Sequence, residues 1–285
     1  MKFLFKGYTL LIILVILSIL SLFIGVSQLS ITDLFHLSDN QKNILFSSRI
    51  PRTISILLSG SSLALAGLVM QQMMQNKFVS PTTAGTMEWA KLGILLSLIF
   101  FPKGHILIKL TFAVALSLGG TFLFVKLINF IKVKEVIFVP LLGIMIGGIV
   151  SSFTTFIALR TNALQSINNW LNGNFAVITS GRYEILYLAI PLLIIAYIFA
   201  NHFTIAGMGK DFSHNLGVKY EQIINIALLI TATLTALVVV TVGTLPFLGL
   251  IVPNIISMYR GDHLKNALPH TLMLLSLIHI SEPTR

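Results

Sequence analysis

The stretch from Tyr8 to Gln28 reads YTLLIILVILSILSLFIGVSQ and contains no charged residue. A helix needs about 20 consecutive apolar residues to cross the hydrocarbon core of a bilayer, and this run has that length. The rest of the chain has the same character, since 55% of its residues are hydrophobic and only 10% are charged, with a mean hydropathy of +0.92. Soluble domains carry about a quarter of their residues as charges, so the sequence predicts a membrane protein.

The first run is longer than the apolar region of a cleaved signal peptide and continues into Ser30 to Asp33, so we expect a retained helix. The chain contains no cysteine, which excludes disulfides, thiolate metal sites and cysteine nucleophiles. The net charge of +10 comes from Lys and Arg in short clusters between apolar runs. This pattern favours membrane topology over nucleic-acid binding, and it moderately favours a cytoplasmic N-terminus.

Apolar runs bounded by Gly, Pro and charged residues recur along the chain. Lipid offers the backbone no hydrogen bonds, so runs of this length must be helical, and the predicted fold class is an all-α transmembrane bundle. A ninth span is expected to begin near Leu268 and to be cut off. The eight predicted spans are residues 8–28, 53–74, 88–101, 106–128, 136–158, 185–200, 222–245 and a short one at 249–260.

The residues from Leu275 to Arg285 read LSLIHISEPTR. This string matches one reading frame of a transposase-based sequencing-library adapter. We therefore expect residues 275–285 to be an artefact and exclude His279 and Glu282 from the candidate sites. Residues 1–274 are expected to form a single transmembrane domain that is truncated at its C-terminal end.

The middles of the predicted spans are almost free of ionisable residues, whereas ion-coupled transporters keep such residues for proton or ion relay. Glu88 lies at the start of a span and can pair with Lys91 three residues later, so an ion pair is favoured over a relay. The sequence also lacks the phosphate loop G-x-x-x-x-G-K-[ST], and it shows no catalytic pair in mid-span for an intramembrane enzyme. The chain is therefore predicted to be a passive channel or the membrane part of a machine that a partner powers.

Two arginines flank a proline in the segment Arg49-Ile50-Pro51-Arg52, which precedes the second span. Proline is expected to fix a turn at the helix start, and residues three apart can face the same way. The guanidinium groups can snorkel to the membrane interface or bind the carboxylates of a docking partner. The residues alone leave both interpretations open.

A glycine-bounded segment separates the sixth and seventh predicted spans. Asp211 is expected to cap a short helix that Gly217 ends. Such a helix suits a lever inserted into a partner's groove, although an ordinary loop also fits these residues. Small residues from Ser59 to Gly67, and Gly143 with Gly147, predict close helix packing. The seven histidines form no pair at ligand spacing within a span, so no metal site is predicted.

These segments together resemble the FecCD family of permeases, from about Arg49 to Pro269. That family carries iron-siderophore complexes, haem or vitamin B12 across the inner membrane, and it works with an ATPase dimer and an extracytoplasmic binding protein. It has ten spans per subunit. The motifs that carry the resemblance are Arg49-Ile50-Pro51-Arg52, Gln71 to Pro81, Gly209 to Gly217, and Gly243 to Pro269 with GLIVP at 249–253 and GDH at 261–263.

The resemblance implies three sets of functional residues. The residues implied for docking of the binding protein are Arg49 and Arg52. The residues implied for coupling to the ATPase are Gly209, Asp211, Ser213, Leu216 and Gly217. The residues implied for the translocation path or its inner gate are Gln71, Asn76 and Pro81.

The resemblance also implies the function: a permease subunit of an ABC importer that moves a ferric siderophore across the bacterial cytoplasmic membrane. A partner subunit would bind the ATP, with no cofactor or metal in this chain. The segments 82–91 and 169–175 look like the branch that serves catecholate or petrobactin-type siderophores, where two different permeases often pair, so the second permease makes a homodimer or a heterodimer. The alternatives are an ion-coupled secondary transporter, or an ABC permease for haem or vitamin B12.

Three positions depart from the family pattern. Asn254 stands where histidine is frequent, Ser213 stands where alanine is common, and Glu88-Trp89 replaces small residues. These departures leave the order of the motifs intact.

Overall fold

The computed structural model describes residues 7–23, 38–131, 135–175 and 178–281, without the side chains of His279 and Ser281. Within these ranges the fold is all-helical, and the only extended pairing is an isolated bridge between Asn172 and Thr244. The α-helices are α1 (Gly7–Phe23), α2 (Asp39–Ile44), α3 (Ile50–Met73), α4 (Thr86–Phe100), α5 (Ile106–Ile131), α6 (Phe138–Arg160), α7 (Leu164–Leu171), α8 (Ala189–Ile198), α9 (Ala200–Ala206), α10 (Lys210–Asn215), α11 (Tyr220–Thr241), α12 (Leu248–Arg260) and α13 (Leu264–Ser281).

Each predicted span contains at least one of these helices, but their lengths differ. Four described helical stretches are long and apolar enough to cross a bilayer, and there are five if the pair formed by Tyr183–Ile198 and Ala200–Ala206, bent by 60°, counts as one span. In contrast, α4 and α12 have only 15 and 13 residues. The all-helical, multi-pass character is therefore confirmed, whereas the count of eight spans and a truncated ninth stays a prediction. Residues 275–281 continue α13 in the structure, and residues 24–28 of the first predicted span lie outside the described ranges.

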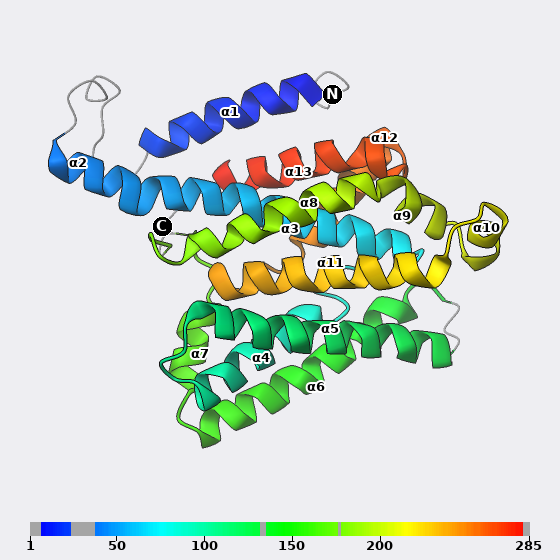
Figure 1. Cartoon of the computed structure of the whole chain (residues 1–285), viewed down its shortest axis with the longest axis horizontal. Coiled ribbons are helices and arrows are strands. Elements are labelled where there is room, and N and C mark those ends of the chain that lie inside the picture. Colours follow the sequence, from blue (N-terminus) through cyan, green and yellow to red (C-terminus); the bar gives the residue numbers. More distant parts are fainter. Residues whose placement is uncertain (1–6, 24–37, 132–134, 176–177, 282–285) are drawn as a thin grey trace.

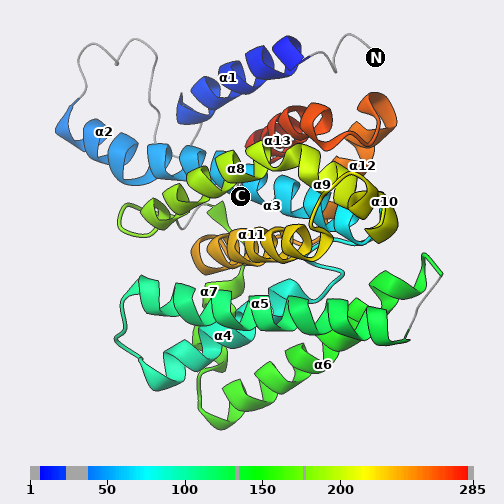
Figure 2. The same ribbon diagram turned by 45° about the vertical axis from the view of Figure 1, so that its right-hand side comes forward.

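The helices lie side by side, with α3 and α11 in the middle and α1 and α6 on opposite outer sides (Figures 1 and 2). In the most apolar 18-residue stretch of each helix, 78% is buried in α3 and 72% in α11, against 33% in α5 and 28% in α6. The short helix α10 lies at one end of the bundle, and α2 and α7 lie at the other (Figure 1). The outer faces of α5 and α6 remain apolar, as expected where lipid or another subunit covers them.

Small residues allow the closest helix crossings, as the sequence predicted. A methyl group on Gly67 of α3 would lie only 1.8 Å from the carbonyl oxygen of Gly249 in α12. On α6, a methyl group on Gly143 would lie 2.1 Å from the carbonyl oxygen of Thr83, and Gly147 faces the backbone of Gly85. The two backbones therefore touch directly at each crossing, a packing that any side chain larger than hydrogen prevents.

Candidate functional site

Gln71 ties together three segments at the end of the bundle that carries α10. It lies in the last turns of α3 with only 8% of its surface exposed. Its side-chain amide donates to the carbonyl oxygen of Lys77, at 3.1 Å, and to that of Leu250 in α12, at 3.3 Å. The linker that follows α3 is thereby fixed against α12.

Asn76 and Pro81 lie in the same linker, between α3 and α4. The Asn76 amide donates to the carbonyl oxygen of Val136, 2.7 Å away, just before α6, and its own oxygen accepts from the backbone of Phe78. Pro81 is buried, and its Cδ would lie 3.6 Å from a methyl group on Gly249. The structure therefore brings the three residues implied for the path or inner gate into one linker region, where α3, α6 and α12 meet.

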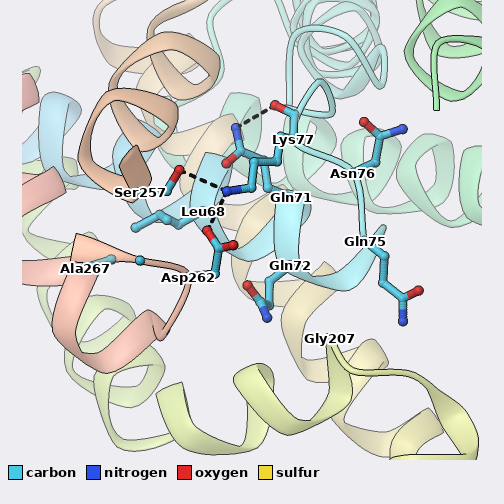
Figure 3. Close-up of a pocket in the computed structure, with 11 residues that line it drawn as sticks. Leu68, Gln71, Gln72, Gln75, Asn76, Lys77, Gly207, Ser257, Asp262 and Ala267 are labelled. Carbon is cyan, nitrogen blue, oxygen red and sulfur yellow. Dashed lines mark hydrogen bonds and ion pairs between the residues drawn. The ribbon is translucent and has the colours of Figure 1, made fainter. Parts of the chain in front are cut away.

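Lys77 of this linker forms a charged cluster with residues of α12 and of the turn before α13 (Figure 3). The sequence did not indicate this cluster. The ammonium group of Lys77 donates to Asp262, at 2.5 Å, and to the hydroxyl of Ser257, at 3.1 Å. Asn254 donates to the carbonyl oxygen of Lys77, at 2.9 Å. The linker after α3 is thus joined to α12 and to the turn before α13. A cavity of ≈ 200 Å³ lies beside this cluster and reaches Gly207.

The predicted short helix between the sixth and seventh spans exists as α10. Gly209 precedes it with φ 109° and Gly217 follows it with φ 71°, conformations that favour glycine. The prediction that Asp211 caps it is wrong, because Gly209 occupies the N-cap and Asp211 lies in the first turn with no cap hydrogen bond. Ser213 is fully buried, and its hydroxyl donates to the carbonyl oxygens of Gly209 and Ile205.

Apolar side chains are exposed on and beside α10. Met208, Phe212 and Leu216 are 55%, 47% and 55% exposed. Phe212 lies within the helix, Leu216 is its C-cap, and Met208 precedes it on the other side of Gly209. We call these three exposed apolar side chains the α10 stripe. Ser213, next to Phe212, is turned inward and holds the helix against the chain before it.

The base of α10 rests against the end of α3. A methyl group on Gly207 would lie 2.4 Å from the side-chain nitrogen of Gln72, and one on Gly209 would lie 3.4 Å from that of Gln75. Figure 3 places Gln72 and Gln75 on the side of α3 that faces Gly207, and Lys77 on the side of Asp262. Gln72 and Gln75 therefore connect the start of α10 with the end of α3 that precedes Asn76 and Lys77.

Arg49 and Arg52 lie at the opposite end of the bundle and inside a helix. The expected helix start at Pro51 is wrong: a capping box of Ser38 with Gln41 starts α2, and a π-helical turn from Leu45 to Arg49 joins α2 to α3 without a break. Arg49 is only 7% exposed and donates to the carbonyl oxygen of Leu22 in α1, at 2.7 Å. The Nε of Arg52 has no hydrogen-bond partner among the described residues.

A second cationic cluster lies at that end, around Trp170 of α7. The guanidinium of Arg182 lies over the indole ring at 4.3 Å, and the ammonium of Lys109 lies over it at 5.3 Å. The indole nitrogen and Arg182 both donate to the carbonyl oxygen of Val240 near the end of α11. Burial lowers the pKa of Arg182. These hydrogen bonds pair a carbonyl group near the C-terminus of α11, where cations are favoured. Stabilisation of this helix end therefore explains why the two cations lie here.

Glu88 and Lys91 of α4 form the predicted ion pair, with 2.6 Å between carboxylate oxygen and ammonium nitrogen. Both side chains are about one fifth exposed, and the Glu88 side chain faces Gly147 of α6. The second carboxylate oxygen of Glu88 is buried without a hydrogen-bond partner among the described residues, so the ion pair satisfies only one of its two oxygens.

Comparison with known proteins shows one family over nearly the whole chain. The profile of the FecCD transport family matches residues 12–281. A petrobactin import system permease protein, YclN of Bacillus subtilis (strain 168), is 55% identical over 263 residues, which are 92% of this chain and 83% of that protein. A second petrobactin import system permease protein, FatD of Bacillus anthracis, is 40% identical over 90% of this chain and 75% of its own length.

A solved structure has the same fold. A metal-chelate type ABC transporter in an inward-facing conformation superposes with a TM-score of 0.78, covering 96% of this chain and 87% of the other. The sequence identity is 23%, so this likeness concerns the arrangement of the helices. The order and packing of α1 to α13 are thus an established transporter architecture.

Proposed function

Because this chain belongs to the FecCD transport family and is a permease subunit of an ABC importer for ferric siderophores, we propose that its cargo is of the petrobactin type. This proposal is supported by the sequence identity of the chain to two petrobactin import system permease proteins, which is 55% for one and 40% for the other. We place the subunit in the plasma membrane of a bacterium, with the α10 end in the cytoplasm. Short apolar helices such as α4 and α12 then complete the bundle within the bilayer.

The energy for transport comes, in this proposal, from an ATPase dimer that binds α10. The α10 stripe of Met208, Phe212 and Leu216 is apolar and exposed at the end of the bundle that this proposal places in the cytoplasm. Exposed apolar side chains on a short helix suit a groove in a protein partner. The coupling residues that the resemblance implies fit this role: Leu216 for contact, Ser213 for anchoring, and Gly209 and Gly217 for the two turns, with Asp211 in the first turn.

The observation that carries this proposal is the contact between the base of α10 and the end of α3. Motion of α10 acts on Gln72 through Gly207, and the same segment holds Gln71, Asn76 and Lys77. We assign the linker of residues 74–85 to the inner gate, with the contact between Lys77 and Asp262 as its latch. Opening toward the cytoplasm separates this linker from α12, and closing restores the hydrogen bonds.

Docking of an extracytoplasmic binding protein is proposed at the opposite end, near Arg49 and Arg52. Arg52 is the better candidate for direct contact, because its side chain is partly exposed, whereas Arg49 is only 7% exposed and is bound to α1. Arg49 then acts by holding α1 against the helix on which Arg52 stands. Carboxylates on the binding protein are the expected partners, since guanidinium groups bind them in bidentate fashion.

The proposed function predicts ATP-driven uptake in membrane vesicles that contain the permease pair and the ATPase. With ferric petrobactin on the binding protein outside and ATP inside, we expect iron to accumulate, and an uncoupler to have no effect. The variant Arg52→Glu should lower uptake about tenfold, since a reversed charge weakens docking by roughly 1.4 kcal/mol or more. The measurements are radioactive iron uptake and binding-protein affinity.

Lys103→Glu is the matched control, because Lys103 is exposed in the loop at the same end and forms no ion pair among the described residues. Uptake that needs no ATP, or that collapses with the uncoupler, would contradict the importer assignment. An unchanged affinity of Arg52→Glu for the binding protein would remove only the docking assignment.

The latch predicts a smaller effect, because both its side chains are about half exposed, at 52% and 62%. Exposed ion pairs contribute about 0.2–1 kcal/mol, which corresponds to at most about a fivefold shift between two states. Asp262→Asn should therefore lower coupled uptake about two- to fivefold while ATP hydrolysis continues. The ratio of iron transported to ATP hydrolysed is the quantity to measure.

The exchange of both residues, Lys77→Asp with Asp262→Lys, should restore most of the lost coupling. Asp39→Asn serves as the control, since Asp39 forms a similar exposed pair with Lys42 at the far end of the bundle. If the exchange restores nothing, the contact between Lys77 and Asp262 is not a latch.

A further inference from the structure

A second cavity, of ≈ 1040 Å³, adjoins the linker that we assign to the gate. It lies between the α10 ends of α5 and α11, and it is bounded by the end of α3 and by Gly209 at the start of α10. The helices α5 and α11 run side by side in both views of the bundle (Figures 1 and 2). One of them, α5, is among the least buried spans, so the cavity borders a surface that faces lipid.

The wall of this cavity away from the α10 end is apolar. It is formed by Phe122 and Val125 of α5 and by Ile224 and Leu228 of α11. Phe122 is 51% exposed, so the apolar wall continues onto the outer surface of α5. A hydrocarbon chain lying along this wall would remove apolar surface from a poorly packed gap.

The other side of the cavity, toward α10, is polar and positively charged. Lys126 and Asn129 come from α5, and Lys210 comes from α10. The carboxylate of Glu221, also in the lining, is paired with Lys210 at 3.0 Å, so its charge is compensated. Lys126 is exposed and forms no ion pair or hydrogen bond with any residue that the structure describes. The cavity therefore has a net positive end and an apolar end.

We propose that this cavity binds an anionic phospholipid, with the phosphate beside Lys126, the lysine of the lining that has no ion pair among the described residues, and an acyl chain along Phe122, Ile224 and Leu228. Basic pockets between transmembrane helices are suited to anionic head groups, and the apolar wall gives a place to the chain that a free phosphate does not have. A volume of this size matches a lipid-sized ligand. The proposal rests on the transmembrane assignment and does not depend on which cargo the permease carries.

Such a lipid would act on α10. Gly209 and Lys210 lie in the cavity lining and at the start of that helix, and Gln75 in the same lining touches Gly209. A bound head group would hold the base of α10 against α5 and α11, from which the coupling motion starts. Membranes rich in anionic lipid should therefore favour coupled transport by this permease.

The binding itself can be tested on the purified permease in detergent by native mass spectrometry, with phosphatidylglycerol and phosphatidylcholine as competing probes. Wild-type protein should retain phosphatidylglycerol at least about fivefold more than phosphatidylcholine, given the attraction of each basic residue near a head group. Lys126→Glu should remove this preference, and Lys126→Gln, which keeps a polar side chain, should reduce it. Lys103→Glu, at the other end of the bundle, should leave it unchanged.

A second variant separates lipid binding from simple anion binding. Val125→Trp places a large side chain against the apolar wall and should lower phosphatidylglycerol retention without removing either lysine. The proposal is overturned if Lys126→Glu retains as much phosphatidylglycerol as wild type. It is also overturned if glycerol phosphate competes as well as the lipid, because the site would then bind a free anion. A third contrary result would be that the bound ATPase, in lipid-free protein, alone protects Lys126 from an amine reagent, because the ATPase would then cover the site.

Discussion

Replacing Gly67 with alanine is expected to separate α3 from α12 and to lower the amount of folded permease in the membrane several-fold. The new methyl carbon would lie 1.8 Å from the Gly249 carbonyl oxygen, whereas carbon and oxygen in contact are about 3.3 Å apart. The obstacle is backbone, so no side chain can turn aside. Overpacking of this kind costs about 3 kcal/mol or more, and such losses change cellular abundance markedly.

Gly119→Ala supplies the control for this experiment. Gly119 also lies in a long helix, α5, but a methyl group there would meet nothing within 4 Å. Membrane fractions and thermal melting of the detergent-solubilised protein should show wild-type behaviour for Gly119→Ala and a lower melting temperature for Gly67→Ala. Equal melting temperatures for both variants would show that the backbones of α3 and α12 are farther apart at Gly67 than this contact requires.

The second large effect is expected for Leu216→Asp, on the α10 stripe. Burying a leucine side chain against a partner stabilises the contact by about 1.5–3 kcal/mol, and a carboxylate there would also lose its hydration. We expect at least about a tenfold loss of ATP-driven uptake and of ATPase that co-purifies with the permease. The folded permease should remain at its normal level, because Leu216 is 55% exposed and contributes little to its own bundle.

His214→Asp adds a carboxylate to the same helix on the side away from the stripe, where His214 is also exposed. It should retain the ATPase. Loss of the ATPase from both variants would mean that any negative charge on α10 disturbs the complex, and loss from neither would remove α10 as the coupling element.

The helices were predictable from the sequence, whereas the number of spans stays a prediction. Apolar runs such as Tyr220–Thr241 have the length and composition that only a helix satisfies in lipid. The short spans predicted at 88–101 and 249–260 correspond to α4 and α12, which begin within two residues of those bounds and directly after left-handed residues at Gly85 and Phe247. A single sequence gives little sign of the left-handed turn at Phe247, because phenylalanine is not a residue type that favours positive φ.

The part of the candidate site that could be predicted is α10, because glycines bound it in the sequence. Gly209 and Gly217 mark the ends of α10 because few other residues adopt their backbone angles. The latch escaped prediction because Lys77 and Asp262 are 185 residues apart, and only the packing of α3 against α12 brings them together. The start of α3 was misplaced for a different reason: a π-turn carries the helix through Arg49, where the proline suggested a beginning.

The short lengths of α4 and α12 restrict where this chain can gain or lose residues. At 15 and 13 residues they span about 22 Å and 20 Å, less than a hydrocarbon core of about 30 Å, so irregular backbone must cover the remaining depth. In the linker before α4, the backbone N–H groups of Ser80 and Thr83 donate to each other's side-chain hydroxyl, and Val79 and Ala84 are completely buried. This irregular segment therefore satisfies polar groups without water. Insertions and deletions are then confined to the loops at the two membrane surfaces, where water can solvate new amide groups.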